Sequence, residues 1–112
     1  MSSYSMKRFT NPTQLGTSAT TIYTAGTGVT ATVKEVLVSN VSGSAQSLSL
    51  HFVPSGGIAS NVNLMIPALS ISATSLLTID LNQVLNAGDT IQAFASATTS
   101  LNLMVSGFEA VA

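Results

Sequence analysis

The chain has 112 residues, a hydrophobic share of 46%, no cysteine and a formal net charge of −1. Without cysteine it forms neither disulfides nor thiolate metal sites, so a hydrophobic core must hold the fold together. Only 6% of the residues are charged, against about 25% in an average soluble domain, so the chain lacks the basic surface that recruits nucleic acids and anionic membranes. Because so little charge favours association, we expect a subunit whose faces are covered in an assembly; a small uncharged domain of the extracellular type is the alternative.

Residues 1–19 show no regular hydrophobic period and contain the chain breakers Pro12 and Gly16. We therefore predict an N-terminal arm over residues 1–19 and a β-sandwich domain over residues 20–112. The arm carries large apolar groups and a basic pair that fit no local element, which favours docking on a neighbouring subunit; a disordered tail is the alternative. The candidate contact residues are Tyr4, Met6, Lys7, Arg8 and Phe9.

Polar residues, and not an apolar segment, follow the basic pair, so we predict no secretory signal. The longest apolar runs, such as residues 36–38 and 64–66, are far shorter than the ~20 residues of a membrane-spanning helix. We expect synthesis in a cytoplasm and no membrane partner.

The strongest strand signal covers residues 29–40 and follows a short β-rich segment at residues 20–25. Its apolar residues keep one phase as far as Val33 and the opposite phase from Val36 onwards. A strand of period two changes phase only through a bulge, a bend or a passage between sheets. We interpret Lys34–Glu35 as a corner, at which one bent strand serves both sheets.

The next strand, residues 47–53, alternates cleanly. Its pattern puts Leu48, Leu50 and Phe52 on the core side and leaves His51 on the other side, as an exposed or interface residue.

Four more strands complete the pattern, at residues 62–66, 74–81, 90–96 and 101–111, the first of them ended by Pro67. Gly107 in the last strand indicates a bulge or a close backbone approach. Seven or eight short strands separated by turn signals predict an all-β fold. We expect an antiparallel β-sandwich, with jelly-roll or immunoglobulin-like connections.

Residues with catalytic or metal-binding chemistry are few and scattered. The only histidine has no acid placed by any recognisable signature to orient it as a general base. One histidine without cysteine does not make a zinc site. Asp89 with Asn86 is compatible with a calcium site, but an Asx residue that caps its own turn is the commoner arrangement. We expect no catalytic, cofactor-binding or metal-binding residues, and a protein that is not an enzyme.

Three stretches occur in order within about residues 20–111: TIYTAGTGVTATVKEVLVSNVSGSAQSLSLHFVPSGG, LLTIDLNQVLNAGDTIQAFAS and LNLMVSGFEAV. In their order and spacing they resemble a class of small all-β structural proteins of tailed bacteriophage virions. The resemblance implies a capsid decoration or cement protein that stabilises the particle through subunit contacts, or else a tail, baseplate or fibre component.

The same resemblance implies a homo-oligomer, often a trimer in this class, made in the host cytoplasm and located in the virion. Its partners would be other virion proteins, the major capsid protein or tail proteins. The class has no catalytic residues to carry over. A host-receptor or glycan-binding module that uses the loops at residues 54–57 and 86–89 is the alternative.

Overall fold

The structure is a computed structural model that describes residues 3–111; residues 1, 2 and 112 lie outside the described part. The described residues form eight strands and one turn of 3-10 helix. The strands are β1 (Ser3–Gln14), β2 (Thr20–Thr24), β3 (Val29–Asn40), β4 (Gln46–Val53), β5 (Leu64–Ile71), β6 (Ser75–Leu85), β7 (Thr90–Ala95) and β8 (Leu101–Val111), and the 3-10 turn η1 is Asn61–Asn63.

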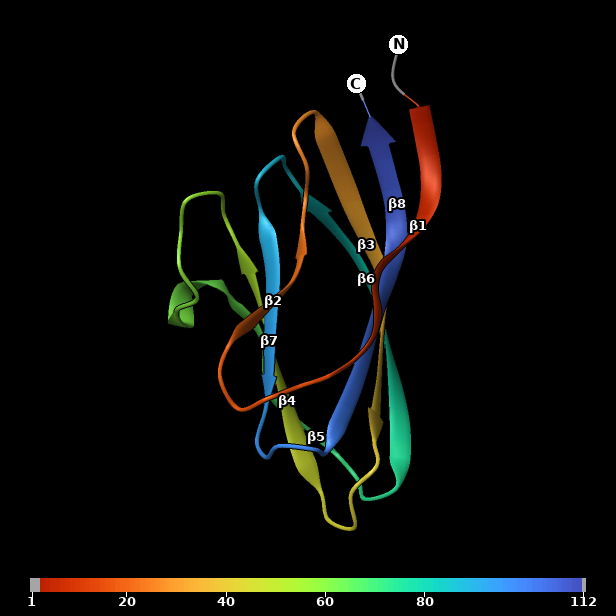
Figure 1. The fold of residues 1–112 in the computed structure, drawn as a ribbon, viewed down its shortest axis with the longest axis vertical. Helices are drawn as coiled ribbons and strands as arrows, with labels where there is room; N and C mark the ends of the chain where they lie inside the picture. The colour runs from red at the N-terminus through yellow and green to blue at the C-terminus, as the bar shows by residue number, and fades with distance from the viewer. Residues whose placement is uncertain (1–2, 112) are drawn as a thin grey trace.

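The strands form two four-stranded antiparallel sheets that pack face to face (Figure 1). Sheet A has the order β1-β8-β3-β6, and sheet B has the order β2-β7-β4-β5. Strands one and eight, two and seven, three and six, and four and five are thus neighbours, as in a long hairpin rolled into a sandwich. The predicted antiparallel sandwich is confirmed, and its connections are those of a jelly roll.

The first strand corrects the predicted division at residue 19. Residues 3–14 pair with β8 and form an edge strand of sheet A. Phe9 is buried in the core, and beyond the strand the Leu15 amide donates to Leu101 O at 2.9 Å. These residues therefore belong to the sandwich and do not form an arm in front of it. The alternation was hidden because the register of β1 shifts twice between Arg8 and Thr13.

The change of phase in β3 is a β-bulge. Against both neighbours the register shifts between Val33 and Glu35. Against β8 the extra residue is Lys34, whereas against β6 the extra residue lies on β6, where residues 81 and 82 oppose Lys34. Because Lys34 is extra relative to β8, Val33 and Val36 both point into the core and are fully buried. A bulge was one of the options that the pattern allowed, but the interpretation that the strand serves both sheets is wrong, because β3 pairs only with β6 and β8 of sheet A.

Gly107 of β8 lies opposite Val33, next to the bulge. A Cβ atom on Gly107 would stand 2.0 Å from Thr32 O and 3.1 Å from the Lys34 amide nitrogen. The predicted close backbone approach is confirmed. The residue must be glycine because the bulged backbone of β3 fills the space that a side chain would need.

Strand β5 continues through Pro67, where the sequence pattern had ended it. It is an edge strand of sheet B, and its register with β4 shifts at the Pro67–Ala68 step. Ala68 has a φ of 47°, and its amide donates to Ser49 Oγ at 3.1 Å. An edge strand with a bulge tolerates proline because the missing amide leaves no ladder bond unmade.

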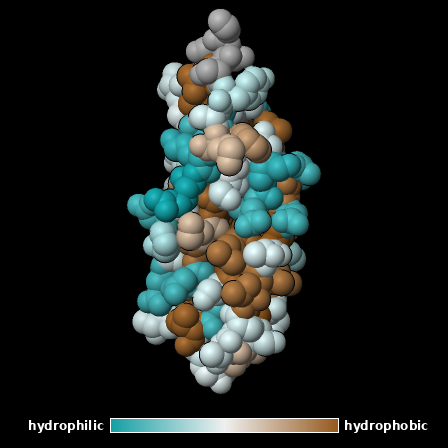
Figure 2. All heavy atoms as spheres, turned by 90° about the vertical axis from the view of Figure 1, so that its right-hand side faces the viewer, coloured by the Kyte–Doolittle hydropathy of each residue, from teal (hydrophilic) through white to brown (hydrophobic). Residues whose placement is uncertain are grey.

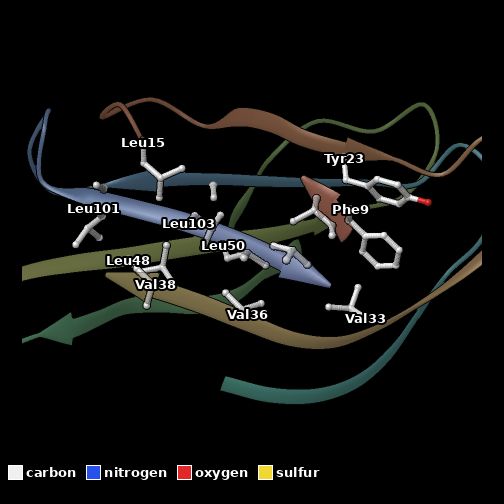
Figure 3. Close-up of a cluster of buried hydrophobic side chains, with 14 of the residues drawn as sticks. Phe9, Leu15, Tyr23, Val33, Val36, Val38, Leu48, Leu50, Leu101 and Leu103 are labelled. Carbon is white, nitrogen blue, oxygen red and sulfur yellow. The ribbon is translucent and has the colours of Figure 1, made fainter. Parts of the chain in front are cut away.

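The core fills the space between the sheets with Val, Leu and Ala side chains (Figure 3). Each sheet contributes fully buried side chains, Val36 and Leu103 from sheet A and Leu48 and Leu50 from sheet B. At one end the rings of Phe9 and Tyr23 stack with their centroids 4.4 Å apart. The sandwich is therefore held together by apolar packing along its whole length and by one aromatic pair at the end.

Two residues of β4 differ from their predicted environments. Phe52 is only half-buried, at the margin of the core. His51 is buried on the outer side of sheet B, where its Nδ1 lies 2.9 Å from Asn63 Oδ1 of the β4–β5 connection. His51 is thus neither exposed nor free, because this connection folds back over its strand.

Replacing Leu50 with Ala is expected to lower the free energy of unfolding by about 2–5 kcal/mol, since a fully buried side chain leaves a cavity. Phe52→Ala should cost less, although it removes a larger side chain, because Phe52 keeps contact with solvent. Urea unfolding of both variants measures the difference. Equal destabilisation, or a larger effect for Phe52→Ala, would contradict this boundary of the core.

Gly107→Ala is expected to destabilise the fold by about 1–3 kcal/mol or more, because the added methyl group overlaps the backbone of β3. The matched control is Gly43→Ala in the β3–β4 turn, where an added Cβ meets nothing within 4 Å. Thermal unfolding compares the two variants. A Gly107 variant as stable as the Gly43 variant would show that β3 and β8 do not approach so closely.

Candidate interaction surface

The outer face of sheet A is built of rows that run across the strands, because paired residues point to the same side of a sheet. The register of the three strand pairs defines these rows. Starting at the end where both termini lie, they are Tyr4, Ala110 and Thr30; Met6, Phe108, Thr32 and Val84; Arg8, Ser106, Glu35 and Asp80; Met104, Leu37 and Thr78; and Gln14, Asn102, Ser39 and Leu76.

Large apolar side chains on this face are open to solvent. Their exposed fractions are 76% for Tyr4, 82% for Met6, 66% for Leu76, 58% for Val84 and 39% for Phe108. Figure 2 looks onto this side of the molecule and shows apolar surface gathered over its middle and lower part. Exposed apolar area that is contiguous in this way marks an interaction surface.

A shallow depression of about 470 Å³ opens on the half of this face nearer the termini. All three basic residues of the chain line it, together with two of the exposed apolar side chains. The lining residues are Met6, Lys7, Arg8, Lys34, Ser106, Gly107 and Phe108. Arg8 and Lys34 therefore bring positive charge beside the apolar surface of this face, whereas the Lys7 ammonium is engaged with Glu109.

The charged row of this face holds both signs of charge at opposite edges. Arg8 lies on edge strand β1, and Asp80 lies on edge strand β6 with Glu35 directly opposite it on β3. Like charges placed opposite each other on neighbouring strands repel. Within residues 3–111 none of these three side chains forms an ion pair, and Lys34 donates to Asn82 Oδ1 instead of an acid.

Lys7 points the other way and joins a buried cluster that links the two sheets. Its Nζ lies 3.3 Å from Glu109 Oε1 on β8. The other carboxylate oxygen of Glu109 accepts a hydrogen bond from the Tyr23 hydroxyl of β2, in sheet B. Burial, reinforced by the hydrogen bond to Glu109 and the charge of its carboxylate, raises the pKa of Tyr23 well above its ordinary value.

The five predicted contact residues thus divide into two groups. Tyr4, Met6 and Arg8 lie on the outer face of sheet A and remain candidates for a partner contact. Lys7 is engaged with Glu109, and Phe9 is buried in the core of its own chain. Phe9 is therefore no contact residue, because the strand that carries it is part of the sandwich.

Sequence reasoning missed the rest of this face. Leu76, Val84 and Phe108 are exposed on strands β6 and β8. The pattern placed Leu76 in the opposite phase to Leu77, Ile79 and Leu81, but it ended that strand before Val84 and gave Phe108 no outward position. What it did not show is that β6 and β8 lie in the same sheet as the N-terminal strand. The strand order was needed for that.

Residues considered for chemistry serve the fold. Asp89 accepts hydrogen bonds at 2.9 Å from the amides of Asn86 and Ser55, which confirms its interpretation as a turn residue. Among residues 3–111 no three His, Cys, Asp or Glu side chains gather in a way that would hold a metal ion. In the same part of the chain, no helix is long and apolar enough to cross a bilayer.

The two loops considered for receptor binding meet in the structure. The amide of Ser55, in the first loop, donates to Asp89 of the second, and the Gly88 amide donates to Ala25 O at 2.8 Å. Chain segments from β2–β3, β4–β5 and β6–β7 thus gather at one end of sheet B. Their polar groups bond to one another, so the loops support each other's conformation.

No family model and no curated protein matches the chain. Several solved structures are similar to it in fold. A chain of the Bacillus endospore appendages, described as a novel family of disulfide-linked pili, superposes with a TM-score of 0.58 at 12% identity, over 99% of this chain and 89% of that one. A chain of infectious bursal disease virus, Gx strain, superposes with a TM-score of 0.51 at 12% identity, over 98% of this chain and 32% of that one.

Tyr23→Phe is expected to remove a pH dependence of stability. Unfolded tyrosine loses its proton near pH ~10, whereas the raised pKa keeps folded Tyr23 protonated, so stability falls as the pH rises above that value. The slope reaches at most about 1.4 kcal/mol per pH unit. Urea unfolding between pH 8 and 11.5 should show a smaller loss for Tyr23→Phe than for the native chain.

The matched control for this experiment is Tyr4→Phe, because Tyr4 is exposed on the outer face of sheet A. Its unfolding should follow the native pH dependence. If Tyr4→Phe and Tyr23→Phe reduced the loss equally, the buried bond to Glu109 would not be its cause.

Proposed function

We propose that this chain is a non-enzymatic structural subunit of a bacteriophage virion, most simply a capsid decoration or cement protein. It stabilises the particle through contacts between subunits. A component of the tail, baseplate or fibre is the alternative within the same class, and its contacts would be of the same kind.

The observation that carries this proposal is the outer face of sheet A. Its exposed apolar side chains belong to strands and lie on both sides of the charged row, and apolar surface gathers over the middle and lower part of this face (Figure 2). A chain with 6% charged residues has little electrostatic repulsion to keep such a surface apart from others. The surface is therefore suited to permanent burial in an assembly.

The fold is compatible with such a role, and the sequence resemblance points to it. Two of the solved structures with this fold come from a virus and from bacterial appendages described as pili, both of which are assemblies. The chain has no cysteine, so its own contacts cannot be the disulfide links by which those pili are described. Apolar and polar contacts between strand faces remain.

A host-receptor or glycan-binding module is a second candidate, favoured by the loops that meet at one end of sheet B. Ile58 and Val62 in the adjoining β4–β5 connection are 79% and 90% exposed. Loop variants such as Val62→Asp would then lose binding to host cells while binding to particles is kept.

The test is sedimentation with particles. Purified chain should sediment with virions of the bacteriophage that encodes it after these have been depleted of the native protein, and should raise the temperature at which they release their genome. Separated heads and tails distinguish the two locations, because a decoration protein binds heads. A chain that binds neither heads nor tails would overturn the proposal.

A further inference from the structure

We propose that the outer face of sheet A is covered by a second copy of the chain, related by a two-fold axis that runs along the strands between β8 and β3. The proposal rests on the proposed function, since it names the partner of the face that the structural role requires. It is an isologous contact, in which the same surface is used by both copies.

The strand order determines what such an axis brings together. Half a turn about a line parallel to the strands keeps the height of each residue and reverses the order of the strands. Strand β1 of the second copy then lies over β6, and its β8 lies over β3. The two sheets would face each other about 10 Å apart, as packed sheets do.

The charged row is complementary to itself under this rotation. Arg8, Ser106, Glu35 and Asp80 follow one another across sheet A at the same height. The second copy's Arg8 therefore lies over Asp80, and its Ser106 lies over Glu35. Each copy contributes both contacts, so the interface contains two such arginine–aspartate pairs.

The neighbouring rows match as well. Met6 of one copy lies over Val84 of the other, and Met104 lies over Leu37. Met6 and Val84, which are 82% and 58% exposed in the single chain, are thus covered by apolar groups, and the ionic pairs lie between two apolar layers.

The orientation of the axis is decided by charge. A two-fold axis across the strands, along the charged row, would place Arg8 on Arg8, Glu35 on Glu35 and Asp80 on Asp80. That arrangement buries like charges against each other, which is strongly unfavourable. Only the axis along the strands joins opposite charges.

The distribution of acids within the chain supports the same conclusion. The chain has four acidic residues, and two of them are satisfied internally: Glu109 by Tyr23 and Lys7, and Asp89 by backbone amides. The other two, Glu35 and Asp80, lie side by side and repel each other. A facing arginine relieves this repulsion, and the same face supplies one.

The size of the face is sufficient for a specific contact. Four strands about 4.8 Å apart and ten residues at about 3.4 Å give a face about 19 Å wide and about 34 Å long. Two such faces bury roughly 1,300 Å², which lies within the range of stable protein interfaces.

Charge reversal tests the pairing. In sedimentation equilibrium the native chain should be a dimer, and Arg8→Glu and Asp80→Arg should each weaken it at least about tenfold, since each places like charges together. The double variant restores opposite charges and should recover most of the affinity. A monomeric or trimeric native chain, or a double variant no tighter than the singles, would overturn the proposal.

A matched pair of substitutions tests the location of the contact. Val84→Asp, on the face, should dissociate the dimer, whereas Val62→Asp, in η1 beyond sheet B, should not. Both side chains are exposed, so circular dichroism should show the native fold for both. Equal effects on the dimer would contradict a contact through sheet A.

Cross-linking, at a protein concentration where sedimentation equilibrium shows each cysteine variant to be dimeric, tests the orientation, and the chain has no native cysteine that would react as well. Arg8→Cys mixed with Asp80→Cys should form a covalent dimer with a short bis-maleimide, because the two positions face each other across copies. Arg8→Cys alone should form little, since its two copies lie at opposite edges. Efficient linkage of Arg8→Cys alone would indicate the other axis and overturn the proposal.

Particle binding separates this inference from the proposed function. If the charge-reversed variants still dimerise as the native chain does, the dimer proposal fails. If the chain nevertheless binds virions, the structural role stands. If the dimer behaves as described but the chain binds no virion, the structural role in a virion fails and the self-contact stands.

Discussion

The close contact between the bulge of β3 and Gly107 of β8 is the constraint on which the rest of sheet A depends. One residue that is extra relative to β8, Lys34, lets Val33 and Val36 both enter the core. Without the bulge, the residues of β3 on one side of Lys34 would exchange the core face for the outer face of sheet A, and Glu35 would point into the sandwich. The bulged backbone in turn requires a residue without a side chain opposite it. The same local distortion therefore determines the core and places the acids on the outer face.

The edges of the sandwich are closed by contacts between sheets as well as by the core. Phe9 stacks on Tyr23 across the sheets, and Tyr23 reaches Glu109, which Lys7 neutralises in part. This cluster ties β1 to the body of the fold. Because Phe9 and Lys7 are turned inward, the residues between and before them, Met6 and Arg8, are turned outward. The exposure of the candidate surface is thus a consequence of how β1 is anchored.

A jelly roll hosts many activities, so the function must be argued from a surface and not from the fold. In this chain the surface has two unusual properties. It is apolar on strands, where soluble proteins usually place polar groups. Three of its charges, Arg8, Glu35 and Asp80, lie in one row and form no ion pair within residues 3–111. Both properties raise the free energy of an isolated molecule. Burial against a complementary surface removes the exposed apolar area and pairs the charges. A subunit of an assembly satisfies this requirement directly.

By itself, the sequence determined what depends on neighbours along the chain. Period-two alternation defined seven of the eight strands and the all-β class, the phase change marked the bulge at Lys34, and Gly107 marked the close approach. It also showed that so few charges suit association. The first strand escaped detection because two register shifts broke its period. Only the tertiary structure decided which strands lie side by side, and hence that Arg8, Glu35 and Asp80 share a row. Pairing between strands that are distant in sequence is determined by the packing of the whole core, and it leaves no local pattern in the sequence.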